Sequence, residues 1–116
     1  MIKTILVADD ELEISSFLKK ALERKRCVVS VASDGLKAKE ILDTKSFDAV
    51  LLDCSMPGLT GPELIKVIRQ KSPLAKIIIF SGYSAVDGKL AQDLGADGFM
   101  QKPLTIKMIE QMLKLK

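Results

Sequence analysis

The sequence predicts a single α/β domain built around a parallel, five-stranded sheet. Strand-like and helix-like segments alternate along the 116 residues, which is the pattern of βαβ units with right-handed crossovers. The strand-like segments are short and almost entirely apolar, as strands buried on both faces are. No linker, repeat or low-complexity tract interrupts the alternation, so residues 1–116 are predicted to form one domain.

The first part of the chain contains two predicted strands and two predicted helices. Residues 3–8 form a near-continuous apolar run, and residues 27–32 are rich in β-branched side chains, so both are predicted strands. Residues 10–25 carry apolar side chains at helical spacing. A second helix is predicted over residues 34–44, with Asp34 as its N-cap.

The middle of the chain contains a strand, a loop and a helix. Residues 49–53 form an apolar run that ends on a carboxylate and are the third predicted strand. Proline and glycine in residues 55–59 indicate a loop. Thr60 and Glu63 have the spacing of a capping box, which predicts a helix from there to about Gln70.

The last part of the chain adds two strands and two helices. Residues 76–80 are the fourth predicted strand, and residues 98–101 are a short fifth strand. A serine capping box opens a helix over residues 84–94, which Gly95 closes. Thr105 is the predicted cap of a final helix that runs towards Leu115, which brings the expected number of helices to five.

The composition argues against several classes of function. Eighteen basic and 15 acidic side chains give a formal charge of +3 and are interspersed, which is typical of solvated helix faces and not of a nucleic-acid-binding surface. No apolar run approaches the roughly 18–20 residues of a membrane span, and the N-terminus lacks the layout of a signal peptide. We therefore expect a cytoplasmic protein without direct nucleic-acid contact or membrane insertion.

The two cysteines do not indicate a metal site. Cys27 and Cys54 form no CxxC pair, and the chain has no histidine that would complete a set of thiolate and imidazole ligands. Both lie in or beside apolar runs, so they are predicted to be buried, reduced thiols.

Polar residues follow four of the predicted strands at the point where each strand ends. These residues are Asp9 and Asp10, Asp53, Ser81, and Lys102. Ligands of open parallel sheets bind beyond the carboxyl ends of the strands, so these side chains are expected to meet at one edge. Three carboxylates, a hydroxyl and an ammonium suit a hard cation together with a phosphoryl group.

The carboxylates are candidate ligands of Mg²⁺, with Mn²⁺ as the alternative ion. Asp9, Asp10 and Asp53 would supply oxygen ligands, and the backbone carbonyl of Ser55 would turn towards the same ion. Asp10 is equally suited to cap the first helix. Glu11 is expected to be a less suitable ligand, because it is placed within the first helical turn, where its charge suits the helix N-terminus.

Asp53 is the candidate nucleophile. Carboxylates accept phosphoryl groups to give acyl phosphates. Asp53 is followed by Pro57, Gly58 and the better helix cap Thr60, so capping does not explain its presence. A divalent cation and Lys102 would keep Asp53 ionised, and Ser81 would donate a hydrogen bond to a phosphoryl oxygen.

Taken together, these motifs resemble the receiver domain of two-component response regulators, with the chemotaxis regulator as one member. All occur in order, with 43 positions from Asp10 to Asp53 and 49 from Asp53 to Lys102. The segments that carry the resemblance are Val7-Ala8-Asp9-Asp10-Glu11, Leu52-Asp53-Cys54-Ser55-Met56-Pro57-Gly58, Phe80-Ser81-Gly82-Tyr83 and Gly95-Ala96-Asp97-Gly98-Phe99-Met100-Gln101-Lys102-Pro103.

The resemblance implies a fold and a reaction. The fold is a flavodoxin-like, doubly wound sheet with strand order 2-1-3-4-5, an order for which the chemotaxis regulator is a known example. Asp53 would take a phosphoryl group from a sensor histidine kinase or a histidine phosphotransfer protein. The domain would catalyse this transfer and its own dephosphorylation without being a conventional enzyme. The output would be a downstream target protein or an effector domain, reached as a monomer or as a phosphorylation-dependent dimer.

The resemblance also implies a switch and residues that tune it. Ser81 would move towards the phosphoryl group and Phe99 would rotate inward behind it, which changes the face formed by the fourth helix, the fifth strand and the fifth helix. Ser81 stands where threonine is also common in the family, and Phe99 lacks the hydroxyl that a tyrosine would have. Ser55 and Tyr83 occupy positions that tune the lifetime of the acyl phosphate. A cis peptide is expected between Lys102 and Pro103.

Two other classes of function fit parts of the pattern. A pseudo-receiver would bind partners without being phosphorylated, but the complete set of Asp53, Ser81, Lys102 and the acidic pair argues against it. A phosphatase or dehalogenase with an aspartate nucleophile commonly has a second aspartate two residues further on, where this chain has Ser55.

Overall fold

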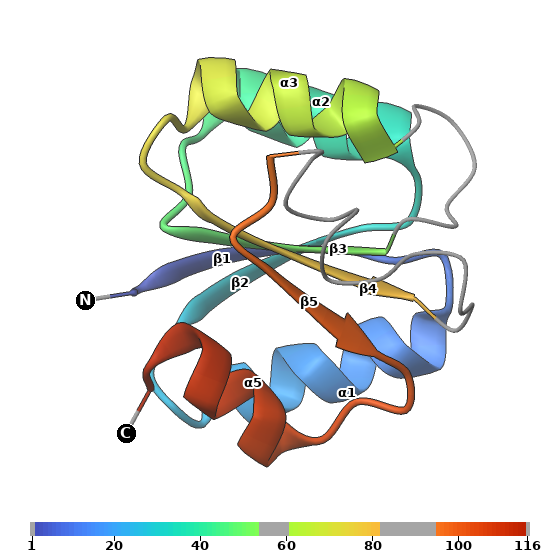
Figure 1. The fold of residues 1–116 in the computed structure, drawn as a ribbon, viewed down its shortest axis with the longest axis vertical. Helices are drawn as coiled ribbons and strands as arrows, with labels where there is room; N and C mark the ends of the chain where they lie inside the picture. The colour runs from blue at the N-terminus through green and yellow to red at the C-terminus, as the bar shows by residue number, and fades with distance from the viewer. Residues whose placement is uncertain (1, 54–60, 82–94, 116) are drawn as a thin grey trace.

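A computed structural model describes residues 2–53, 61–81 and 95–115 of the chain. Five parallel strands form one sheet in the order β2-β1-β3-β4-β5 (Figure 1). This order confirms the predicted 2-1-3-4-5 arrangement. The strands are β1 (Thr4–Ala8), β2 (Val28–Ala32), β3 (Ala49–Asp53), β4 (Lys76–Ser81) and β5 (Gly98–Gln101).

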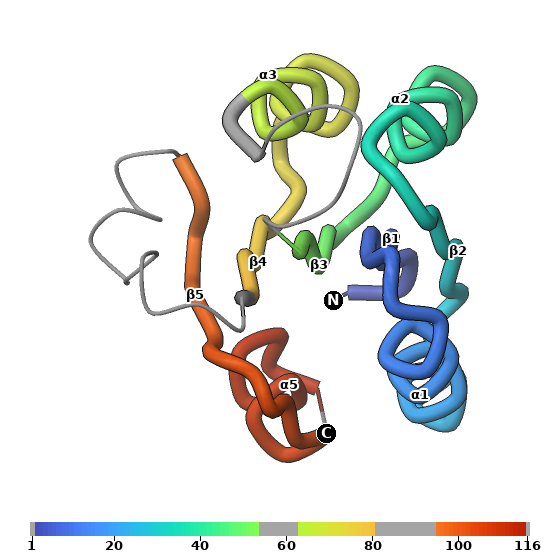
Figure 2. The backbone as a smooth tube through the Cα atoms, turned by 90° about the vertical axis from the view of Figure 1, so that its right-hand side faces the viewer, coloured from blue at the N-terminus to red at the C-terminus, as the bar shows by residue number. Residues whose placement is uncertain are grey.

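Helices cover both faces of the sheet. Helices α2 and α3 lie on one face, and α1 and α5 lie on the other (Figures 1 and 2). The helix predicted over residues 84–94 lies outside the described residues, so four of the five expected helices are seen. These four are α1 (Leu12–Glu23), α2 (Gly35–Thr44), α3 (Gly61–Lys71) and α5 (Ile106–Leu113). None of the described helices is long and apolar enough to cross a membrane.

The apolar strand segments are buried because the sheet has a core on each side. In β1, Leu6 and Ala8 pack towards α2 and α3, whereas Ile5 and Val7 pack towards α1 and α5. Strand β3 lies in the centre of the sheet and is buried along its whole length, which includes its terminal Asp53. An unbroken apolar run that ends on a carboxylate therefore places that carboxylate at the buried edge of the sheet.

Two of the predicted helix caps are confirmed. The Asp34 side chain accepts a hydrogen bond of 2.7 Å from the backbone N–H of Lys37 at the start of α2. Thr105 Oγ1 accepts one of 3.2 Å from the N–H of Met108 at the start of α5. The cap predicted at Thr60 lies outside the described residues.

Helix α1 is shorter than predicted at both ends, and α5 ends at Leu113, short of Leu115. Helix α1 begins at Leu12 and ends at Glu23, inside the predicted range of residues 10–25. Its C-terminal turn is closed by Arg26, which has a φ of 65°, and α5 is closed by Lys114, which has a φ of 55°. Residues with left-handed backbone angles at helix ends are usually glycines, and neither Arg26 nor Lys114 is one. The sequence therefore contains no signal that these helices end here.

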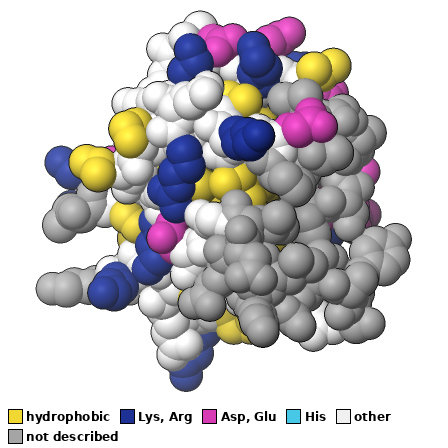
Figure 3. All heavy atoms as spheres, turned by 45° about the horizontal axis from the view of Figure 1, so that its top comes forward, with side chains coloured by type: hydrophobic (Ala, Val, Ile, Leu, Met, Phe, Trp, Pro, Cys, Tyr) yellow, Lys and Arg dark blue, Asp and Glu magenta, His cyan; other side chains and the backbone are white. Residues whose placement is uncertain are grey.

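The charged helix surfaces agree with the mixed-charge prediction. Figure 3 shows Lys and Arg side chains among Asp and Glu side chains on the face turned towards the viewer. The Asp43 carboxylate of α2, for example, pairs with Lys39 of the same helix and with Lys71 of α3, each at 3.4 Å. Such exposed ion pairs contribute little to the stability of the fold. They place basic and acidic side chains next to one another on the surface.

Asp97, just before β5, joins three parts of the chain. Its Oδ2 accepts hydrogen bonds from the backbone N–H of Ile77 at 2.8 Å and from Arg69 Nη2 at 3.0 Å. The same guanidinium donates to the carbonyls of Ala75 at 2.7 Å and Gly95 at 3.0 Å. The end of α3, the start of β4 and the start of β5 are thereby held together.

We therefore expect Asp97→Ala to destabilise the fold. The variant leaves the Ile77 N–H and the Arg69 guanidinium short of a partner, which should cost about 1–2 kcal/mol. At about 4 °C per kcal/mol for a domain of this size, Tm should fall by about 4–8 °C. The measurement is thermal or urea unfolding beside Asp43→Ala, which removes an exposed carboxylate and should change little. Equal Tm values for the two variants would contradict the joining role of Asp97.

Candidate functional site

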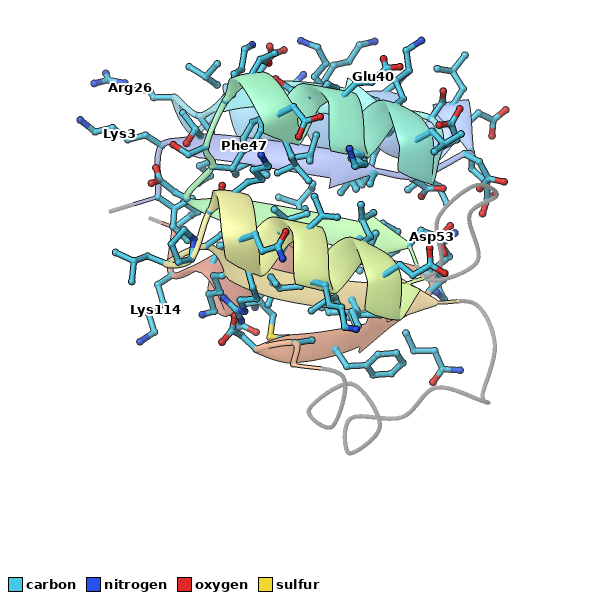
Figure 4. The ribbon with its side chains drawn as sticks, turned by 90° about the horizontal axis from the view of Figure 1, so that it is seen from above. Lys3, Arg26, Glu40, Phe47, Asp53 and Lys114 are labelled. Atoms are coloured by element: carbon cyan, nitrogen blue, oxygen red, sulfur yellow. The ribbon has the colours of Figure 1, made fainter. Side chains whose placement is uncertain are left out.

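The strand order brings two buried aspartates together at the carboxyl edge of the sheet. Strands β1 and β3 are neighbours, and their register pairs Ala8 with Leu52, so Asp9 and Asp53 follow at the same level. Asp9 is 1% exposed and Asp53 is 2% exposed. Figure 4 shows Asp53 at the opposite end of the sheet from Lys3 and Lys114.

Lys102 reaches this edge from β5, although β4 lies between β5 and β3. Its Nζ lies 5.5 Å from the ring centroid of Phe80, which is the last apolar residue of β4. The ammonium thus passes over an aromatic ring, where a cation is stabilised. This path explains how a lysine from the edge strand contacts carboxylates from the two central strands.

The Lys102 ammonium contacts three carboxylates. Its Nζ lies 2.5 Å from Glu11 Oε1, 3.2 Å from Asp53 Oδ2 and 3.7 Å from Asp9 Oδ2. The first two contacts are hydrogen bonds, and the third is a longer ion pair. Lys102 is therefore shared among the acidic groups of the site.

One oxygen of Asp9 accepts a hydrogen bond, and the other lies beside the Lys102 ammonium without accepting one. Asp9 Oδ1 accepts a hydrogen bond of 2.9 Å from the backbone N–H of Glu11. Within the described residues, the buried Asp9 Oδ2 accepts no hydrogen bond. A buried carboxylate oxygen without a donor is costly unless a cation occupies the space before it. Asp9 Oδ2 is therefore suited to ligate a cation.

Four carboxylates gather at this edge. Asp9, Asp10, Glu11 and Asp53 each present an oxygen, and these oxygens lie within 4.8 Å of one another. Together with Lys102 they leave the site strongly negative. Such a set of oxygen donors fits Mg²⁺, which binds one or two carboxylates and keeps several water molecules.

Glu11 lies closer to the site than its predicted place in the first helical turn implies. Glu11 precedes α1 as its N-cap residue, with extended backbone angles, and does not lie within the first helical turn. Its side chain therefore reaches Lys102. Asp10 is not the helix cap either, because the N-cap is Glu11 and the carboxylate that binds the N–H at this turn belongs to Asp9.

Crowding and burial change the proton affinities of these groups. Burial raises the pKa of Asp9 to about 7, and the neighbouring Asp53 adds to this, against the lowering effects of the Glu11 N–H and Lys102. Burial disfavours the Lys102 ammonium, but its hydrogen bond to Glu11 and the charges of Asp53 and Asp9 prevail and raise the pKa of Lys102. The raised pKa of Lys102 means that the carboxylates around it stabilise its positive charge.

The remaining predicted residues are placed only in part. Ser81 ends β4, where its backbone pairs with Gln101 of β5, and its side chain is not among the described ones. Cys54, Ser55 and Tyr83 lie outside the described residues. Phe99 is partly buried against the core on the α2 and α3 side.

Two further expectations are confirmed. The peptide bond between Lys102 and Pro103 is cis. Cys27 is a free thiol, is 5% exposed, and lies in the core on the α1 and α5 side. Burial raises the pKa of its thiol, which is consistent with an inert, reduced side chain.

Comparison with known proteins identifies the family. A family model described as the response regulator receiver domain matches residues 5–114. The chain therefore belongs to the response regulator receiver domain family, and the resemblance inferred from its motifs is confirmed.

Individual relatives agree with this assignment. The transcriptional regulatory protein CpxR of Escherichia coli strain K12 is 39% identical over 99 residues, which cover 85% of this chain and 42% of CpxR. The alkaline phosphatase synthesis transcriptional regulatory protein PhoP of Bacillus subtilis strain 168 is 36% identical over 115 residues, which cover 98% of this chain and 48% of PhoP. This chain thus spans less than half the length of these two relatives.

A solved structure shows the same fold with ligands in place. The response regulator protein TrrA of Thermotoga maritima, in complex with Mg²⁺ and BeF, is 33% identical and has a TM-score of 0.84. The match covers 97% of each chain.

Proposed function

We propose that this domain is a phosphoacceptor in two-component signal transduction, with Asp53 as the residue that takes the phosphoryl group. The observation that carries the proposal is the position of Asp53, which is a buried carboxylate at the end of a central strand and lies 3.2 Å from the Lys102 ammonium. Family membership supports the same reading, and it does not favour a domain that only binds partners.

In the proposed reaction, an oxygen of Asp53 attacks the phosphorus of a phosphohistidine on a sensor kinase or phosphotransfer protein. The P–N bond breaks, its electron pair stays with the imidazole, and an acyl phosphate forms on Asp53. Lys102 stabilises the charge that develops on the phosphoryl oxygens. The hydroxyl of Ser81 is proposed to donate a hydrogen bond to one of them.

The acidic group is proposed to hold Mg²⁺ through Asp9, Asp10, Asp53 and the carbonyl of Ser55, with Mn²⁺ as the alternative ion. When bound, the cation would supply positive charge where the incoming phosphoryl group meets the carboxylates. The Asp9 oxygen that accepts no hydrogen bond in the described site and the net negative charge of that site support this assignment. TrrA, described with Mg²⁺ and BeF, offers a precedent from a related protein.

Output is proposed to follow the switch that the family implies. Ser81 and Phe99 would couple the phosphoryl group to the face of the fourth helix, β5 and α5, and that face would act on a target protein or an effector domain. Phe99 lies on β5 three residues before Lys102, so the backbone of β5 connects it with the site. Ser55 and Tyr83 are proposed to tune the lifetime of the acyl phosphate.

Intact mass spectrometry after incubation with acetyl phosphate tests the proposal. With Mg²⁺, one phosphoryl group should be added, and with EDTA in place of Mg²⁺ none should be added, because the crowded carboxylates then repel the anionic donor. Reduction of the acyl phosphate with borohydride and peptide mapping should locate it at Asp53. No addition, under conditions in which Mg²⁺ binding is confirmed, would contradict phosphoacceptor function.

A further inference from the structure

The shortest ion pair at the carboxyl edge joins Lys102 to Glu11, a residue outside the proposed reaction. Lys102 Nζ lies 2.5 Å from Glu11 Oε1 and 3.2 Å from Asp53 Oδ2, the acceptor carboxylate. In the described site, the ammonium that should neutralise the phosphoryl group is therefore bound most closely by another anion. Glu11 and an incoming phosphoryl group compete for the same hydrogen-bond donor.

The three acidic partners of Lys102 differ in how readily they release it. The side chains of Asp9 and Asp53 are 0% and 1% exposed, whereas that of Glu11 is 58% exposed. A buried carboxylate that loses its partner is left desolvated, while an exposed one is hydrated by water. Glu11 is thus the partner that Lys102 leaves at the lowest cost.

The local structure also suits Glu11 to a state without Lys102. Glu11 is the N-cap residue of α1, and the backbone N–H of Ser15 donates to its carbonyl at 3.1 Å. Its own N–H is held by Asp9 Oδ1, so its backbone position does not depend on Lys102. A free carboxylate at a helix N-terminus is favoured by the helix dipole.

Building on the function proposed above, we propose that Glu11 is a positioning residue that holds the Lys102 ammonium in the unphosphorylated site and must release it when a phosphoryl group reaches Asp53. Release of Lys102 from Glu11 is then part of the barrier to phosphorylation. Glu11 therefore slows the transfer of the phosphoryl group to Asp53, which Lys102 promotes.

Glu11→Gln tests this role through its effect on phosphorylation kinetics. The amide keeps the shape of the side chain but holds the ammonium less strongly, so the rate constant with acetyl phosphate at saturating Mg²⁺ should rise by about two- to fivefold, which corresponds to the weakening of one partly exposed ion pair. The half-saturating Mg²⁺ concentration should rise as well, because one nearby negative charge is lost.

Glu13→Gln is the matched control. Glu13 is an exposed acidic residue in the first turn of the same helix, and the substitution removes the same charge. Its rate constant at saturating Mg²⁺ should equal that of the parent. A Glu11→Gln rate constant that is equal to or lower than that of the parent at saturating Mg²⁺ would overturn the proposal. A parent chain that takes up no phosphoryl group would instead contradict the function on which it rests.

A double-mutant cycle in urea tests the contact without any phosphoryl transfer. Glu11→Gln should change the unfolding equilibrium constant about two- to fivefold more in the parent than in a Lys102→Met background, the range of a partly exposed ion pair. Equal effects in the two backgrounds would mean that Glu11 does not act through Lys102 and would overturn the proposal.

Discussion

Asp53→Asn is expected to abolish phosphorylation of the domain. The substitution keeps the size and the buried position of the side chain but removes the nucleophilic carboxylate, so no acyl phosphate can form at this position. The intact mass after incubation with acetyl phosphate and Mg²⁺ should be unchanged for the variant and increased by one phosphoryl group for the parent. The expected effect is therefore a complete loss of the added mass.

The matched control for this experiment is Asp43→Asn. Asp43 lies on the exposed surface of α2, where it pairs with Lys39 and Lys71, and its substitution removes a carboxylate from the same chain. This variant should be phosphorylated at the rate of the parent. Phosphorylation of Asp53→Asn to the extent seen with Asp43→Asn would show that another side chain is the acceptor.

Asp9→Asn is expected to weaken Mg²⁺ binding strongly and, at the same time, to stabilise the metal-free fold at pH 8. Asp9 provides the buried oxygen that has no hydrogen-bond donor in the described site, so its loss should lower Mg²⁺ affinity on the order of 100-fold. Isothermal titration of Mg²⁺ into parent and variant at pH 8 measures this change.

The stability effect follows from the raised pKa of Asp9. Because the folded-state pKa of about 7 lies above the ordinary 3.8, the fold binds this proton more tightly than the unfolded chain does. The stabilisation from that proton is fully present below about pH 4 and is lost as the pH rises through 7. At pH 8 the ionised, buried carboxylate therefore destabilises the metal-free parent, and asparagine removes this cost.

The expected gain for metal-free Asp9→Asn at pH 8 is at least about 1 kcal/mol, or about 4 °C in Tm. The gain should shrink as the pH is lowered towards 4, because Asp9 is then protonated in the parent. Asp10→Asn removes the same charge from an exposed position and should change stability by no more than about 0.5 kcal/mol. A variant that is less stable than the parent at pH 8 without metal would contradict the assigned cost of burial.

Much of the fold and of the site can be predicted from the sequence, because strands that are buried on both faces of the sheet are almost entirely apolar. The run from Ala49 to Asp53 is apolar until its last residue, and the structure makes it a central strand with a buried terminal carboxylate. The caps at Asp34 and Thr105 were predictable as well, since a short polar side chain precedes an apolar helical pattern at each.

Other features depend on helix ends and long-range contacts, which the local propensities of the residues do not determine. Glu11 enters the site because α1 begins at Leu12, and a shift of the helix start by one or two residues lies within the ordinary uncertainty of helix boundaries. Arg69 and Asp97 interact although they are 28 positions apart in the sequence, and no local sequence pattern predicts such a contact. Arg26 closes a helix in a conformation for which glycine is the usual signal.

The placement of the acidic cluster gives the molecule an electric polarity. The cluster with Lys102 is negative overall, yet the whole chain carries a formal +3, so the rest of the molecule is more basic than the total suggests. Basic side chains that include Lys3, Arg26 and Lys114 lie at the end of the sheet away from Asp53 (Figure 4). A partner with a positively charged rim should therefore attract the domain with the Asp53 edge foremost, and salt should slow that encounter by screening the field.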